Sequence, residues 1–175
     1  MLPGSEEIPV YVINLEKDRQ RWQDMQEALS RCGFRGKRFA AIYGAALSNE
    51  HFRKYREFIP TITRLFCPRS ALGCALSHRL LCKQYLEEDP AEVCLILEDD
   101  CQPVMEPPRT LLAQVLAEAP PDWEVIKLDY WPHVAMTEYK SLKAFPSFNA
   151  GAYLLRKSGA RKFMSKRIYY HLDVE

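Results

Sequence analysis

The chain has 175 residues, of which 47% are hydrophobic and 27% are charged, with a formal net charge of +1. This length and composition fit one globular domain, residues 1–175, with room for a substantial core. The small net charge and the scattered basic residues give no reason to expect nucleic acid as a partner, and no apolar stretch approaches the ~20 residues that span a bilayer.

Two features of the sequence, its first residues and its cysteines, indicate the cellular compartment. The first seven residues lack a basic region followed by an apolar one, so no signal peptide is predicted. The six cysteines have no CxxC spacing, which argues against a structural zinc site and favours free thiols in a reducing compartment. We therefore expect a cytoplasmic protein; peripheral membrane association and the secretory pathway stay open.

The first 44 residues predict a strand, a helix and a second strand. A β-branched run over 8–15 is followed by a helical pattern that Asp18 caps and that ends near Gly33. A second strand is predicted over 38–42. This βαβ unit favours a right-handed crossover between two parallel strands.

The rest of the chain continues the alternation of helices and strands. Helices are predicted over 47–58, 70–86, 109–119 and 157–166, and strands over 93–97, 123–128 and 150–155. Such alternation is typical of an α/β domain with a mostly parallel central sheet. The chain stops shortly after a cluster of aromatic and acidic residues, so we expect that a C-terminal segment is missing.

Three carboxylates follow the buried strand over 93–97: Glu98, Asp99 and Asp100. Open α/β sheets bind ligands at the carboxyl ends of their strands. Packed like charges repel each other unless a cation neutralises them, and a hard divalent cation with oxygen ligands would do so. The alternative is an ordinary solvated acidic turn.

Other polar groups fall at the predicted carboxyl ends of strands and are expected to share one crevice with these acids. Arg19 and Arg21 open a helix, where a phosphate is favoured, although they also fit a solvated helix face. The remaining groups of this kind are Asn14 with Leu15, Gly44 after Tyr43, and Asp129.

Two further pairs carry hydrogen-bonding side chains. Ser77 and His78 lie on the helix before the acidic strand, where a histidine more often holds a core position than binds a ligand. His171 and Asp173 alternate in the tail and would point to the same side of an extended segment, or lie on the surface. The fingerprints GxGxxG, GxxxxGK[ST] and GxSxG are absent at the expected places.

Taken together, these motifs resemble glycosyltransferase family 25, which holds lipooligosaccharide and collagen galactosyltransferases. The similar segments, in the family's order, are Ile13-Asn14-Leu15 with Asp18-Arg19 and Arg21-Trp22, Gly73-Cys74-Ala75-Leu76-Ser77-His78, Leu95-Ile96-Leu97-Glu98-Asp99-Asp100, Ala150-Gly151-Ala152-Tyr153 with Ser158-Gly159-Ala160, and Asp173. Two features depart from the family: Tyr43 stands where relatives often have Asp, and the chain ends just after Asp173.

The resemblance implies a Rossmann-like GT-A domain that moves a hexose, galactose first, from a UDP-sugar to a hydroxyl of a glycan or glycosylated acceptor, with inversion. It also implies Mn²⁺ or Mg²⁺ held by Asp100 and Asp99, with His171 as a third ligand. Asp173 is the first choice for the base that takes the acceptor's proton, and Asp129 the second. The expected donor-binding residues are Asn14, Leu15, Arg19, Arg21, Gly44, Ser77, His78, Glu98 and Asp99.

Two other functions stay open. Tyr43 and the early end of the chain are consistent with a catalytically inactive relative that binds a nucleotide sugar or a glycan. A phosphatase with an acidic strand end is less consistent, because Cys101-Gln102-Pro103 follows the acids where a DxD-type nucleophile loop is needed.

Overall fold

The structure, a computed structural model, describes residues 8–56, 67–101, 108–128 and 150–165. These residues contain one five-stranded sheet with the strand order β2-β1-β3-β5-β4. Its strands are β1 (Val10–Asn14), β2 (Gly36–Ala40), β3 (Val93–Glu98), β4 (Val125–Lys127) and β5 (Ala152–Arg156). The α/β class predicted from the alternating pattern is therefore confirmed.

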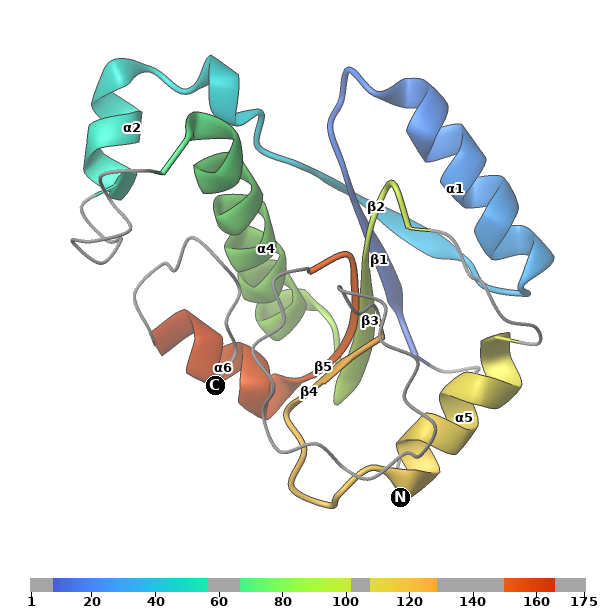
Figure 1. The fold of residues 1–175 in the computed structure, drawn as a ribbon. Helices are drawn as coiled ribbons and strands as arrows, with labels where there is room; N and C mark the ends of the chain where they lie inside the picture. Colours follow the sequence, from blue (N-terminus) through green and yellow to red (C-terminus); the bar gives the residue numbers. More distant parts are fainter. Residues whose placement is uncertain (1–7, 57–66, 102–107, 129–149, 166–175) are drawn as a thin grey trace.

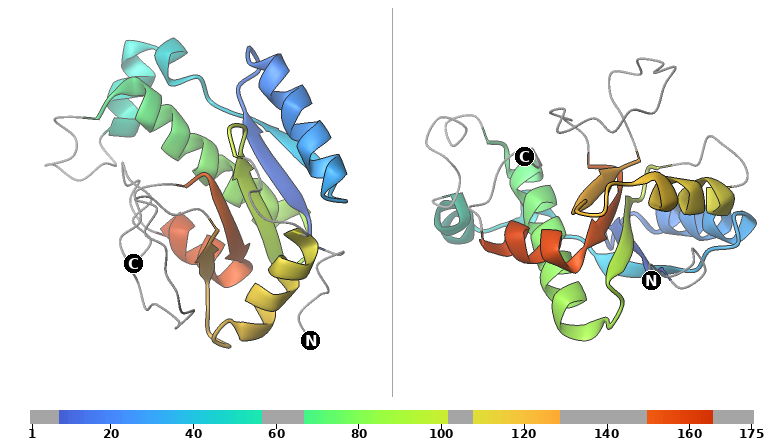
Figure 2. Two further views of the ribbon diagram at one scale, coloured as in Figure 1. Left: turned by 45° about the vertical axis from the view of Figure 1, so that its right-hand side comes forward. Right: turned by 90° about the horizontal axis from the view of Figure 1, so that it is seen from below.

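Helices cover both faces of the sheet, as Figures 1 and 2 show. One face carries α1 and α5, and the other carries α4 and α6, with α2 packed beside the first half of α4. The helices are α1 (Arg19–Arg31), α2 (Asn49–Arg56), α4 (Arg69–Glu88), α5 (Pro108–Glu118) and α6 (Lys157–Ser165), and a 3₁₀ turn, η1, spans Gly44–Ala46. Among the described helices, none is long and apolar enough to cross a membrane.

The sheet is mixed: four strands run in one direction, as a mostly parallel sheet requires, and one strand runs against them. β1 pairs in parallel with β2 and with β3, whereas β5 runs antiparallel to both β3 and β4. Half of the four strand pairings are thus antiparallel, although β5 alone runs against the other four strands. Periodicity indicates that a segment is a strand but not its direction, because strands of either direction alternate in the same way.

Alternation along each strand divides the core into two layers. Val10 and Val12 of β1 face α1 and α5, while Tyr11 and Ile13 face α4 and α6. The same parity holds in β3, where Leu95 joins the first layer and Ile96 the second. Side chains that follow one another at a strand end therefore point towards different helices.

The predicted elements are confirmed with shifts of one or two residues at most of their ends, where helices and strands fray. β2 is displaced as a whole, because it spans Gly36–Ala40 rather than 38–42. β2 is an edge strand, and the two residues that the prediction left out, Gly36 and the exposed Lys37, provide no hydrophobic side chain. Charged side chains on an edge strand also discourage pairing with another chain.

Candidate functional site at the carboxyl ends of β1 and β3

Asn14 is the buried centre of a polar cluster at the end of β1. Its side chain is 1% exposed, and its Nδ2 donates to the Asp18 carbonyl at 3.0 Å and to Asp99 Oδ2 at 2.6 Å. Its Oδ1 accepts a hydrogen bond from Arg38 Nε at 2.8 Å. Arg38 also donates to the Leu15 carbonyl at 3.2 Å, so the amide ties β1, β2 and the end of β3 together.

Arg21 holds the other oxygen of Asp99. Its guanidinium lies 3.3 Å from Asp99 Oδ1, and its side chain is 57% exposed whereas that of Asp99 is 11% exposed. The ion pair with Asp99 raises the pKa of Arg21 further above its ordinary value. An exposed, permanently charged guanidinium therefore lies at the mouth of the site, held by a carboxylate that Asn14 orients.

An open pocket of about 530 Å³ lies between α1 and the residues that follow β3. Arg21 and Arg31 supply its positive charge, and Asp99, Asp100, Asp24 and Glu27 its negative charge. The predicted neighbours Arg21, Asp99 and Asp100 thus share one pocket. Arg19 is exposed at the first position of α1 and does not line it.

Asp100 differs from the two acids before it. Desolvation raises the pKa of its carboxyl above the ordinary value although the residue is exposed, and Glu98 and Asp99 raise it further. Within the described part of the chain, its side chain makes no ion pair. Negative charge therefore accumulates here without a fixed partner, which is where a cation or a hydrogen-bond donor of a ligand would be favoured.

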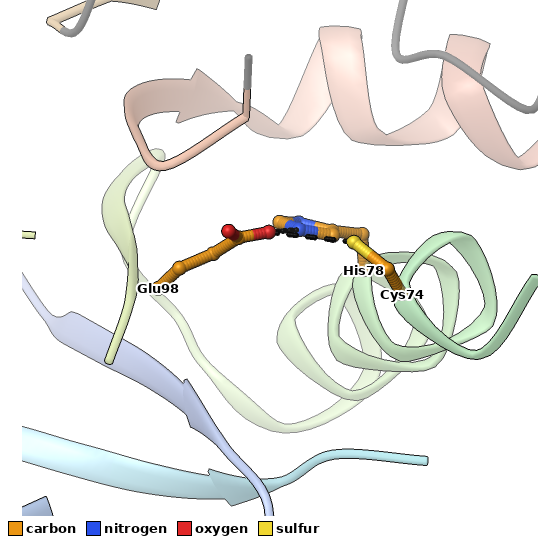
Figure 3. A group of neighbouring side chains, drawn as sticks. All are labelled: Cys74, His78 and Glu98. Atoms are coloured by element: carbon orange, nitrogen blue, oxygen red, sulfur yellow. Dashed lines mark hydrogen bonds and ion pairs between the residues drawn. The ribbon is translucent and has the colours of Figure 1, made fainter. Parts of the chain in front are cut away.

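Glu98 points to the opposite side of the sheet, towards α4 (Figure 3). Its Oε1 lies 3.0 Å from His78 Nε2 and accepts a hydrogen bond from the Cys74 thiol at 3.3 Å. His78 is 0% exposed, and its Nδ1 lies 2.8 Å from the Tyr153 hydroxyl oxygen. Because an ionised carboxylate only accepts, Nε2 carries a proton, and in the neutral ring Nδ1 accepts the Tyr153 hydroxyl hydrogen.

These contacts and the local desolvation shift the pKa values of the clustered groups in opposite directions, although Cys74 is an exposed residue. The hydrogen bond from His78 lowers the pKa of Glu98, so this carboxylate stays ionised. Desolvation and the adjacent Glu98 raise the pKa of Cys74 to about 12, and burial raises that of Tyr153 well above its ordinary value. At neutral pH Cys74 and Tyr153 therefore keep their protons, and Glu98 is a carboxylate.

Ser77 and Gly44 have contacts that position the backbone. Ser77 is 0% exposed, accepts a hydrogen bond from the Ile42 N–H at 2.8 Å and donates to the Gly73 carbonyl at 2.7 Å. A Cβ on Gly73 would lie 2.6 Å from the Gly44 nitrogen, so glycine permits α4 to touch η1 here. The Tyr43–Gly44 turn is thereby held against α4, and Lys17 Nζ lies 4.3 Å from the centre of the exposed Tyr43 ring.

Five of the predicted site residues form two clusters, on opposite sides of β3. Asn14, Arg21 and Asp99 come together on the α1 side of β3, and His78 and Glu98 come together on the α4 side. Asp129, His171 and Asp173 lie outside the described residues, so their roles stay predictions.

Three residues of these clusters were not foreseen as site residues. Cys74 and His78 are four residues apart on one helix, a spacing that places two ligands on the same face and could have been noticed. Tyr153 and Arg38 come from the strands β5 and β2. Tyr153 lies in a segment that resembles the family, but the segment does not indicate its contact with His78, and no local pattern indicates Arg38.

The protein is an α/β domain with helices on both faces of its sheet and a charged pocket at the strand ends. Domains of this class bind ligands at that edge of the sheet. The model of glycosyltransferase family 25, described as an LPS biosynthesis protein, matches residues 7–138. The chain therefore belongs to glycosyltransferase family 25, as the motifs predicted. No curated protein matches it.

Proposed function

We propose that this chain is a UDP-sugar-dependent glycosyltransferase domain of the GT-A type, which transfers a hexose, galactose first, to a hydroxyl of a glycan or glycosylated acceptor with inversion. The observation that carries the proposal is the cluster of Asn14, Arg21 and Asp99 beside an open charged pocket, in a chain that belongs to this family. The predicted cytoplasmic location stays a prediction.

The chemical demand of the reaction is stabilisation of the leaving diphosphate. Arg21 meets this demand as a permanently charged group that is exposed at the pocket yet held near one place by Asp99. We propose that Arg21, with Arg19 as a second cation at the start of α1, contacts the diphosphate, and that the Leu15 carbonyl and Gly44 line the donor. Asn14, Ser77 and His78 are fully engaged inside the protein, so we propose that they position these groups.

A hard cation fits the carboxylates of this site in part. Among the described residues Asp100 makes no ion pair and lies in a negative surrounding, whereas Asn14 and Arg21 engage the two oxygens of Asp99. Asp100 and one oxygen of Asp99, with His171 as the predicted third ligand, would hold Mn²⁺ or Mg²⁺, which neutralises diphosphate charge when bound. Because members of the family usually do not depend on a metal, we place Arg21 first as the neutralising group.

Inversion requires a carboxylate that takes the proton of the acceptor hydroxyl as the new bond forms. We propose Asp173 as this proton acceptor, with Asp129 as the second candidate, and this choice rests only on the sequence motifs. Glu98 is less suited to this task, because its lowered pKa makes it a weak proton acceptor.

Donor binding tests the central part of the proposal. UDP-galactose, UDP-glucose and a GDP-sugar are titrated calorimetrically into the wild-type chain, Arg21→Gln and Arg53→Gln, with EDTA or with Mn²⁺. Arg53 is an exposed arginine of α2 and serves as the matched control. We expect binding of a UDP-sugar that Arg21→Gln weakens roughly 10-fold or more and that Arg53→Gln leaves unchanged. Equal binding by all three proteins, or no binding of any donor, would contradict it.

Transfer assays with the same donor test the chemistry. Asp173→Asn should abolish transfer while donor binding persists. Asp100→Asn should remove any stimulation by Mn²⁺, and unchanged stimulation would exclude Asp100 as the ligand.

A second function, sugar-nucleotide or glycan binding without catalysis, is favoured by one specific observation. Two of the three acids after the strand already have partners inside the protein, Glu98 with His78 and Asp99 with Asn14 and Arg21. A donor that binds tightly but is neither transferred nor hydrolysed over many hours would support this function over catalysis.

A further inference from the structure

We propose that Cys74, His78 and Glu98 form a binding site for a zinc-class divalent cation, separate from the carboxylates that face the α1 pocket. One potential ligand atom from each residue, the thiol sulfur, an imidazole nitrogen and a carboxylate oxygen, lies within 4.8 Å of the other two. Figure 3 shows the three side chains converging from α4 and the end of β3. The proposal stands on this geometry and does not depend on the transfer reaction.

The positions of the ligands follow from two elements that the core already holds in place. Cys74 and His78 are four residues apart on α4, so both side chains lie on the helix face that is turned to β3. The α4 helix packs on β3 through Leu81, Cys82 and Ile96, which are nearly fully buried. Glu98 ends β3 on the α4 side because of the strand's alternation. The three donors are therefore preorganised rather than gathered from mobile loops.

The distances are close to those of a tetrahedral site. With Zn–S near 2.3 Å and Zn–N and Zn–O near 2.0 Å, neighbouring ligand atoms of a tetrahedron are roughly 3.3–3.7 Å apart. Glu98 Oε1 lies 3.0 Å from His78 Nε2 and 3.3 Å from Cys74 Sγ. Movements of a few tenths of an ångström would open the centre to an ion.

The protonation of the cluster also suits a divalent cation. A thiolate and a carboxylate carry two negative charges, which a divalent ion balances. On binding, the Cys74 thiol loses its proton to solvent, and the His78 proton moves from Nε2 to Nδ1. Nδ1 then donates to the Tyr153 oxygen 2.8 Å away, the kind of outer hydrogen bond that orients a metal-bound histidine.

The mixed donor set selects the kind of ion. Sulfur and nitrogen ligands favour zinc and its neighbours among the transition metals, whereas Mg²⁺ and Mn²⁺ favour oxygen ligands. Three protein ligands leave the fourth tetrahedral position to water or to another group. Because Glu98 directly precedes Asp99 and Asp100, an occupied site would clamp α4 to the turn that borders the proposed donor pocket.

Cobalt spectroscopy tests the site without any sugar substrate. The purified, metal-free, reduced chain is titrated with Co²⁺, and near-ultraviolet absorption records the thiolate-to-cobalt band that appears only when sulfur is a ligand. We expect one equivalent to bind with this band. Zn²⁺ should displace it, and a 10-fold excess of Mg²⁺ or Mn²⁺ should not.

Variants assign the ligands. Cys74→Ser should abolish the band, and Glu98→Gln should weaken Co²⁺ binding at least 10-fold. Cys32→Ser, a change of a partly exposed cysteine near the end of α1, should leave both unchanged. Tyr153→Phe keeps the ring but loses the outer hydrogen bond, and should weaken binding roughly 10- to 100-fold. Circular dichroism confirms that each variant is folded.

The proposal fails if the wild-type chain gives no sulfur-to-cobalt band, or if the band survives Cys74→Ser or disappears equally in Cys32→Ser. Loss of metal binding in Cys74→Ser together with intact UDP-sugar binding would separate this site from the proposed donor site.

Discussion

The two sides of the acidic strand end differ in chemistry although their residues are consecutive. On the α1 side, Asp99 meets an exposed arginine and a buried amide beside an open pocket. On the α4 side, Glu98 meets a fully buried histidine and a thiol. The alternation of a strand separates neighbouring carboxylates onto different faces, where each acquires the environment of a different helix. A run of acids in a sequence is thus not necessarily one site.

The largest loss of folding stability is expected on the α1 side, from substitution of Asn14. Asn14→Ala removes the partner of Arg38 Nε, and it leaves Asp99, whose side chain is only 11% exposed, without one of its partners. We expect the free energy of unfolding to fall by about 3 kcal/mol, measured by urea denaturation. Gln26→Ala, an exposed change on α1, is the control and should alter it by less than about 0.5 kcal/mol. A small loss at Asn14 would mean that the polar cluster does not hold β1, β2 and β3 together.

The α4 side is probed by His78→Phe, which keeps an aromatic ring, somewhat larger than imidazole, but leaves the Glu98 carboxylate and the Tyr153 hydroxyl without their shared partner. We expect a loss of about 2 kcal/mol in urea denaturation. Adding Tyr153→Phe should cost less in this background than in the wild type, because the stranded hydroxyl is removed as well. Strictly additive losses would show that the two residues are not coupled.

The pH dependence of folding stability tests the role of Glu98 on the α4 side. Its pKa is lower in the folded chain than the ordinary value of 4.5, so its contribution is fully present above about pH 4.5 and is lost as the pH falls through the folded value. We expect the difference in unfolding free energy between wild type and Glu98→Gln to be about 1 kcal/mol at pH 7 and to shrink on acidification. A difference that is independent of pH would contradict the ionised hydrogen bond.

Substitution of Asp100 should change the free energy of unfolding in the opposite direction, and by the smallest amount. Its pKa is raised by desolvation and by the neighbouring acids, so ionisation costs stability above the folded value. Asp100→Asn should raise the free energy of unfolding at pH 7 by no more than about 0.5 kcal/mol, because the residue is exposed and screened. The gain should disappear below pH 3.8, where the wild-type carboxyl is protonated in both states. A loss of stability at pH 7 would indicate that Asp100 has a cationic partner.

The sequence by itself determined the α/β class, the position of each strand and helix to within a few residues, and the family. Hydrophobic periodicity and short motifs carry this information, because each depends on residues that lie close together in the chain. The same local signals identified Asn14, Arg21 and the three acids as polar groups at strand ends.

Only the tertiary structure decided which of these groups meet. Periodicity does not encode strand direction, so the antiparallel course of β5 was missed, and with it the placement of Tyr153 beside His78. Likewise, the absence of a CxxC pattern argued against a zinc site, yet Cys74, His78 and Glu98 converge from a helix and a strand end. Such convergence depends on how α4 packs on β3, which is a property of the whole core and of no single segment.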